Sequence, residues 1–158
     1  MLDAVRLAKT VGSPVKVIWS REDDVATGKF RPMTAHHIEA GFDAGGKLIA
    51  WHHRVVAESV AGYRAGLTGS APSAIDGIVM KGSSLPQYPI PNKLAEHIVE
   101  ARGARLSSVR GVGVYYNAFA VESFLDEIAK ELGQDPIAFR LELSQGHPRV
   151  QDLLRAVA

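Results

Sequence analysis

The sequence contains no cysteine. This absence excludes disulfides, thiolate zinc sites, iron–sulfur ligation and a cysteine nucleophile within the chain. No apolar run approaches the roughly 20 residues that a membrane-spanning helix needs, and no charged segment followed by an apolar stretch opens the chain. We therefore expect neither a membrane span nor a signal peptide.

The chain also lacks a block of like charges, because its 18 basic and 17 acidic residues are mixed along the sequence and leave a net charge of +1. A nucleic-acid-binding tail would need such a block, so we expect no nucleic-acid partner. The content of 46% hydrophobic and 22% charged residues is ordinary for a globular domain. A length of 158 residues fits one domain.

The first residues already have the spacing of a helix. Apolar side chains recur from Leu2 to Ala8, and Gly12 ends the pattern. Because this helix has neither a capping residue nor a preceding strand, we expect residues 1–158 to form a single segment of a larger domain.

Alternating and β-branched residues predict strands in the first two thirds of the chain. These strands are residues 15–19, 34–42 and 47–59, and the stretch 92–104 begins as a fourth. The turn Asp43-Ala44-Gly45-Gly46 separates the second from the third, and Gly46 suits a positive φ there, so we expect a β-hairpin. Residues 74–80 favour a short apolar helix.

The last third of the chain is helical. From Asn117 onward the apolar residues fall on one helix face: Phe119, Val121, Phe124, Leu125, Ile128, Ala129 and Leu132. Gly133 ends this helix, Asp135-Pro136 starts a second that runs to Leu143, and a third begins after Pro148. The expected fold class is α+β, a mixed sheet that contains the hairpin and packs against the C-terminal helices.

The loop Arg110-Gly111-Val112-Gly113 precedes the long helix and is the first candidate site. A dinucleotide fingerprint needs a third glycine where Tyr116 stands, and a phosphate P-loop needs a Gly-Lys-Ser/Thr sequence that is absent. Two alternatives remain. Either the loop amides bind an anion at the helix N-terminus, or the glycines only form a tight turn.

Two pairs of histidines, His36-His37 and His52-His53, lie in the two hairpin strands. A three-residue loop would place His37 opposite His53, but two imidazoles are too few for a zinc site. We expect polar residues on a hairpin face and assign no metal ligand.

Acidic residues and serines give no catalytic pattern. Glu22-Asp23-Asp24 follows Ser20 and predicts a capped, acid-rich first helical turn. Ser107 and Ser108 lack the context of a nucleophile elbow, which excludes serine hydrolysis by this pattern.

Four stretches, taken in order, resemble the large, molybdenum-binding subunit of the xanthine dehydrogenase/aldehyde oxidase family. They are "AVRLAKTVGSPVKVIWSREDDV", "TGKFRPMTAHHIEAGFDAGGKLIAW", "YPIPN" and "SVRGVGVYYNAFAVESFLDEIAKELGQDPIAFRLEL". The similarity is greatest to the bacterial branch typified by isoquinoline 1-oxidoreductase beta subunits. The resemblance implies a partial molybdopterin-binding domain.

The resemblance also implies roles for the loop. Ser108, Val109, Arg110 and Gly111 would lie near the molybdopterin, with Arg110 nearest the substrate. A guanidinium stabilises oxyanions, and glycine lets the backbone come close to a bulky cofactor. Val112 stands where relatives often carry an aromatic residue, a departure that counts against a flat heterocyclic substrate.

The family reaction is hydroxylation of aldehydes or N-heterocycles with water as the oxygen source. Its glutamate base lies beyond the end of this chain, and Glu122 is not at that position, so no catalytic residue is assigned. The full enzyme would carry molybdopterin as the cytosine dinucleotide, with two partners: the remainder of the large subunit, and a small subunit that holds [2Fe–2S] clusters. The chain alone would be inactive and hold no cofactor. Its compartment would be either the bacterial cytoplasm or the periplasm.

Two alternatives come from other classes of protein. The first is a free-standing, non-catalytic binding or interaction module, derived from such a subunit, whose exposed apolar surface is covered by self-association. The second is a small-molecule binder that uses a pocket between the hairpin and the long helix.

Overall fold

The computed structural model describes residues 2–66, 75–85 and 87–158. Three strands form one sheet in the order β1-β2-β3: β1 (Thr34–Phe42), β2 (Leu48–Ala57) and β3 (Asn92–Val99). β1 pairs antiparallel and β3 parallel with β2, so the sheet is mixed. The helices are α1 (Leu2–Val11), α2 (Arg21–Thr27), α3 (Val60–Arg64), α4 (Val112–Glu131), α5 (Pro136–Leu143) and α6 (Pro148–Val157). The expected α+β class is confirmed.

The hairpin of β1 and β2 forms as expected, but the expected pairing register is wrong by one residue along most of the hairpin. Gly46 has φ +80°, and the Asp43 amide donates to the Lys47 carbonyl. The expected register holds where Phe42 pairs with Leu48, and it shifts between Gly41 and Phe42. Such an irregularity moves every later pair by one. His53 therefore lies opposite Ile38 and not opposite His37.

Local signals set the helix ends. Ser20 and Asp23 form a capping box on α2, and the Asp135 carboxylate accepts from two amides at the start of α5. Gly133, with φ +66°, follows the end of α4. α4 begins at Val112, five residues earlier than the apolar period indicated.

Three expectations for secondary structure and packing are wrong. Residues 15–19 form no strand, because nothing in the described part of the chain pairs with them. In the expected helix at 74–80, residue 74 lies outside the described residues, and residues 75–80 form no helix, with a turn at 77–79. On α4, the side chains of Phe119 and Leu132 are exposed, whereas Val121 and Leu125 are buried as expected.

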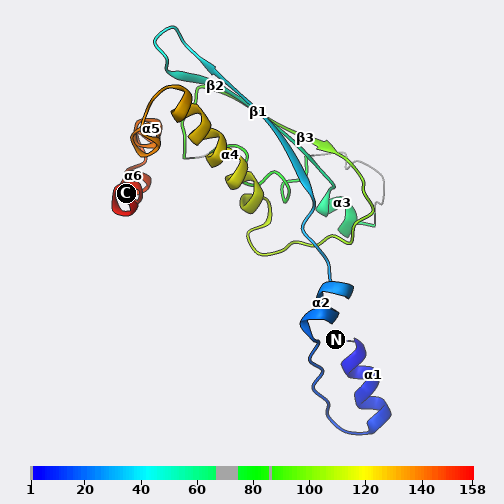
Figure 1. Ribbon diagram of the computed structural model, residues 1–158. Coiled ribbons are helices and arrows are strands. Elements are labelled where there is room, and N and C mark those ends of the chain that lie inside the picture. The colour runs from blue at the N-terminus through cyan, green and yellow to red at the C-terminus, as the bar shows by residue number, and fades with distance from the viewer. Residues whose placement is uncertain (1, 67–74, 86) are drawn as a thin grey trace.

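The core lies between the sheet and α4, which runs along one face of it (Figure 1). Trp51 of β2 is buried, and its ring meets that of Phe124 edge-on, with centroids 5.5 Å apart. A second apolar cluster, around Val55 and Leu106, lies under the segment that leads into α4. The start of α4 is thus held on a packed base.

The N-terminal arm, residues 2–28, stands away from this body (Figure 1). Neither α1 nor α2 has a buried residue. In the described part of the chain, no helix is long and apolar enough to cross a membrane.

Candidate functional site

The backbone kinks sharply where the chain enters α4. Gly111 has φ +92° and Val112 has φ +40°. Glycine adopts the first value without strain, whereas a positive φ is an outlier for a β-branched residue. The kink turns the chain from an exposed loop, residues 107–111, into the helix.

Gly113 is required by close packing. Its amide donates to the carbonyl of Ile78 at 3.0 Å, and a Cβ added there would lie 2.3 Å from the carbonyl oxygen of Val79. The buried side chain of Asn117 donates to the same Val79 carbonyl and to that of Lys81. The first turn of α4 is therefore fixed against residues 78–81.

Backbone hydrogen bonds bear on the two alternatives for the glycine loop, anion binding and a tight turn. The amide of Val112 donates to the carbonyl of Val109, and that of Gly113 is occupied by Ile78. These two helical amides are not available to an anion, so Val112 and Gly113 fit the tight-turn alternative. By contrast, the amides of residues 108–111 donate to no acceptor among the described residues.

Each predicted binding residue lies in this exposed loop. The side chains of Ser108 and Arg110 are exposed, as is Gly111, and Val109 is half-buried. The loop thus presents a hydroxyl, a guanidinium and backbone donors outward from a rigid base. Such a set suits an anionic or acceptor-rich ligand.

Arg31, which the sequence did not single out, contacts this loop. Its Nη2 donates to the carbonyl of Arg110 at 2.9 Å, and its guanidinium lies 4.5 Å from the centre of the Tyr115 ring. A parallel bridge between Phe30 and Leu106 brings Arg31 alongside. Arg31 and Arg110 are 79 positions apart, so no local sequence signal predicts the contact.

The histidines form two different clusters on the two faces of the hairpin. His36 Nδ1 lies 2.9 Å from His53 Nε2 on the inner face. Burial, with the neighbouring His36, lowers the pKa of His53 to about 4, so this pair is neutral at pH 7. On the outer face, the carboxylates of Glu39 and then Glu96 accept hydrogen bonds from His52 and raise its pKa.

Neither cluster suits a metal. Among residues 2–66, 75–85 and 87–158, no group of three or more histidine, aspartate or glutamate side chains could hold a metal ion. The two nitrogens of His52 each face a different carboxylate, as in an ion pair and not as in a shared ligand sphere.

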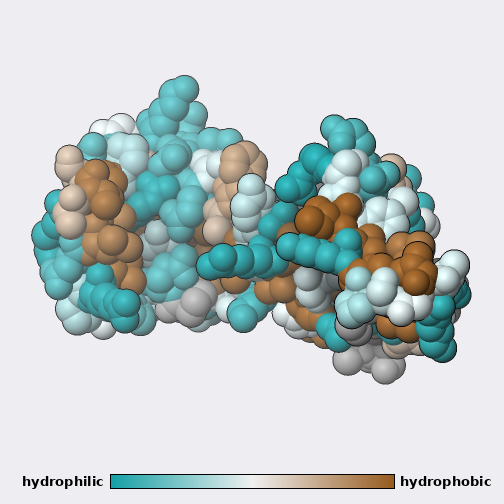
Figure 2. Space-filling view, turned by 90° about the horizontal axis from the view of Figure 1, so that it is seen from below, coloured by the Kyte–Doolittle hydropathy of each residue, from teal (hydrophilic) through white to brown (hydrophobic). Residues whose placement is uncertain are grey.

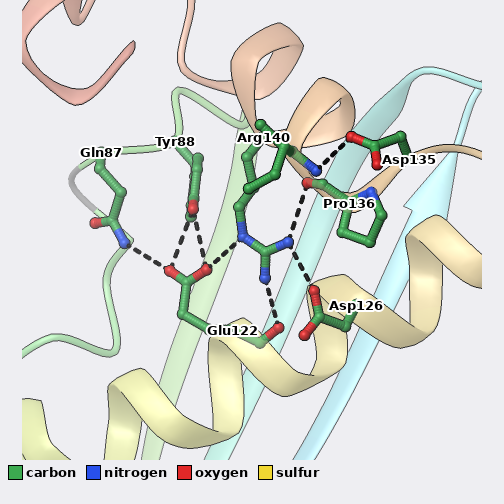
Figure 3. A network of polar contacts seen from close by, with 8 residues as sticks. Gln87, Tyr88, Glu122, Asp126, Asp135, Pro136 and Arg140 are labelled. Carbon is green, nitrogen blue, oxygen red and sulfur yellow. Dashed lines mark hydrogen bonds and ion pairs between the residues drawn. The ribbon is translucent and has the colours of Figure 1, made fainter. Parts of the chain in front are cut away.

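Glu122 belongs to a structural network between α4, α5 and the segment before β3 (Figure 3). Its carboxylate accepts from Arg140 Nε at 2.9 Å and from the hydroxyl of Tyr88. Burial and the Glu122 charge raise the pKa of Tyr88. These contacts explain Glu122 without a catalytic role.

A hollow of about 460 Å³ lies between β1 and α4. Its lining is Ala40, Phe42, Phe124, Glu127, Ile128, Lys130, Glu131 and Leu132. This is the pocket that the small-molecule reading requires, but it includes no residue of the Arg110 loop.

Comparisons with known proteins agree with the sequence resemblance. A family model described as the molybdopterin cofactor-binding domain matches residues 3–142. The chain is similar to the beta subunit of isoquinoline 1-oxidoreductase from Brevundimonas diminuta, with 32% identity over 165 residues that cover 100% of this chain and 20% of that protein. It is also similar to PaoC, the molybdenum-binding subunit of an aldehyde oxidoreductase from Escherichia coli, with 29% identity over 138 residues, 87% of this chain and 17% of that protein.

Among solved structures, quinoline 2-oxidoreductase from Pseudomonas putida 86 superposes with a TM-score of 0.64. The superposition covers 89% of this chain and 17% of that one, at 22% identity, and it shows the fold alone. The chain spans about a fifth or less of the length of the curated relatives.

Proposed function

Because this chain belongs to the molybdopterin cofactor-binding domain family, we propose that it supplies one wall of the cofactor site in the large subunit of a molybdenum hydroxylase. Ser108, Val109, Arg110 and Gly111 bind the molybdopterin, and Arg110 lies nearest the substrate. The whole enzyme oxidises aldehydes or N-heterocycles with water as the oxygen source.

The observation that carries this proposal is the outward presentation of the Arg110 loop. Its amides at 108–111 have no described acceptor, and the side chains of Ser108 and Arg110 are exposed. These donors fit the phosphate and ring acceptors of a pterin nucleotide. The kink at Gly111 and Val112 and the packed Gly113 keep the loop in one place.

When bound, the molybdenum cofactor supplies the redox chemistry of the hydroxylation. The chain's own residues bind and orient. Arg110 offers a positively charged guanidinium to an oxygen of the substrate, because its planar N–H donors match oxyanion acceptors. The backbone donors fix the cofactor edge against which the substrate lies.

The rest of the large subunit completes the site. Among the described residues, nineteen large hydrophobic side chains are exposed, including Leu2, Ile18 and Phe119. Figure 2, a view from below relative to Figure 1, shows several apolar patches on that face of the molecule. Patches of this kind mark contacts with further protein. A [2Fe–2S] small subunit, together with the cytosine dinucleotide form of the cofactor, completes the proposed enzyme.

Native mass spectrometry with molybdenum quantification tests whether this chain alone is sufficient to bind the cofactor. The chain is expressed in a host that makes the cofactor, and we expect bare protein without molybdenum. Stoichiometric molybdenum and a mass surplus of one pterin dinucleotide would contradict the proposed incompleteness. A closed oligomer, without molybdenum, would favour the self-associating module.

A further inference from the structure

The loop that carries Arg110 is held by one side chain from a distant part of the chain. We propose that Arg31 is a positioning residue, which holds the kink at Gly111 and Val112 so that Arg110 and Ser108 are presented to the ligand. The identity of that ligand rests on the proposed function; the anchoring itself does not.

Arg31 contacts the chain on both sides of the kink. Its Nη2 donates to the carbonyl of Arg110 at 2.9 Å, immediately before the kink. Its guanidinium carbon lies 4.5 Å from the centre of the Tyr115 ring, in the first turn of α4. One planar group therefore fixes the distance between loop and helix.

The kink needs such an anchor because it is strained. Val112 has φ +40°, and a residue persists in this region only when its surroundings determine the conformation. From the inside, the carbonyl of Ile78 binds the amide of Gly113 at 3.0 Å. From the outside, Arg31 binds the carbonyl of Arg110, and without it the exposed half of the kink would relax.

Arginine suits this position for a physical reason. A guanidinium stacks on an aromatic ring and donates in its own plane at the same time, which an ammonium group cannot do. The Nε atom of Arg31 is buried and has no described acceptor. Because burying an unpaired N–H is unfavourable, packing alone does not explain why an arginine stands here.

Arg105 offers a matched control. Its guanidinium also donates to backbone carbonyls, those of Ala26 and Thr27, and also lies over a ring, that of Phe30. It contacts the N-terminal arm, however, and not the kink. Loss of Arg105 should therefore leave the Arg110 loop in place.

The test is hydrogen exchange followed by NMR on the 158-residue chain without cofactor. The Val112 amide, which donates to Val109, reports on the kink, and the Leu125 amide in the middle of α4 reports on global opening. In Arg31→Gln we expect Val112 to exchange about fivefold faster, the effect of one lost hydrogen bond, while Leu125 is unchanged. Arg105→Gln should leave both rates within about twofold of the wild type. No change at Val112 in Arg31→Gln, equal rises at Val112 and Leu125, or the same rise in Arg105→Gln would overturn the proposal.

A second substitution separates an anchor of the kink from a merely stabilising side chain. Asparagine adopts positive φ far more readily than valine. Adding Val112→Asn to Arg31→Gln should return the Val112-position exchange toward the wild-type rate, and failure to do so would contradict the strain argument. Since no cofactor is used, these results stand apart from the proposed function, which is tested separately by measuring molybdenum binding.

Discussion

Nε of Arg140 lies 2.9 Å from Oε2 of Glu122, and this contact joins α5 to α4 (Figure 3). The Arg140 side chain is only 9% exposed, and its other nitrogens donate to Asp126 and to the carbonyl of Glu122. Each nitrogen of this buried guanidinium thus donates to at least one acceptor. The network fixes the C-terminal helices on the element that carries the Arg110 loop.

Removal of Arg140 should strongly destabilise the chain. Arg140→Ala leaves the partly buried Glu122 carboxylate without its cation, and we expect a loss of about 3 kcal/mol in the free energy of unfolding. Urea unfolding followed by far-ultraviolet circular dichroism measures it. Arg155→Ala breaks an exposed pair with Asp152 and should change stability by less than about 0.5 kcal/mol. Equal effects of the two substitutions would refute the structural role of Arg140.

Gly113 should not tolerate even one added methyl group. A Cβ there would lie 2.3 Å from the Val79 carbonyl oxygen and 2.6 Å from that of Ile78, both backbone atoms. We expect Gly113→Ala to lower the free energy of unfolding by about 2–3 kcal/mol. Gly77→Ala is the control, since a Cβ at Gly77 meets nothing within 4 Å. A Gly113→Ala variant as stable as the control would disprove the close approach.

The His36–His53 pair should make stability depend on pH. The folded pKa of His53 is about 4, below the value of about 6.5 in the unfolded chain, so the unfolded state binds the proton first. Stability from this group is present above pH 6.5 and is lost as the pH falls toward 4. Between pH 7.5 and pH 5 we expect a loss of about 2 kcal/mol.

The variant His53→Gln isolates this contribution, because Gln does not titrate. Its free energy of unfolding should fall less than that of the wild type over the same pH range, by about the same 2 kcal/mol. His52 acts in the opposite direction: its raised pKa gives stability that is lost as the pH rises. Parallel pH curves for wild type and His53→Gln would rule out a neutral buried His53.

Much of the fold could be predicted because its signals are local. The period of two in β1 and β2, with Gly46 between them, predicts the hairpin, and Asp135 before Pro136 predicts the start of α5. The residues that decide these elements are neighbours in the sequence. For the same reason, the capping box at Ser20 was predicted correctly.

The errors arose where the outcome depends on distant residues. β-branched residues at 15–19 favour a strand, but no partner strand pairs with them in the described part of the chain, and Ile18 is 76% exposed. The irregularity at Gly41 shifts the hairpin register and brings His36 to His53. Similarly, the Arg31–Arg110 contact joins residues 79 apart and could not be predicted from spacing. The four predicted binding residues lie together in one exposed loop, but their role stays a prediction.

A chimaera tests the central claim most directly. This chain replaces the matching fifth of the beta subunit of isoquinoline 1-oxidoreductase from Brevundimonas diminuta, to which it is similar along its whole length. Molybdenum and pterin per purified protein are then measured for the chimaera, for its Ser108→Ala/Arg110→Gln variant and for a control with Arg149→Gln, an exposed residue of α6. We expect the chimaera and the control to retain the cofactor, and the loop variant to retain about a tenth or less, because each charge-assisted hydrogen bond contributes about 1.5–3 kcal/mol. A chimaera that folds but holds no molybdenum, or a loop variant that holds as much as the control, would contradict the proposal that this chain forms a wall of a molybdopterin site.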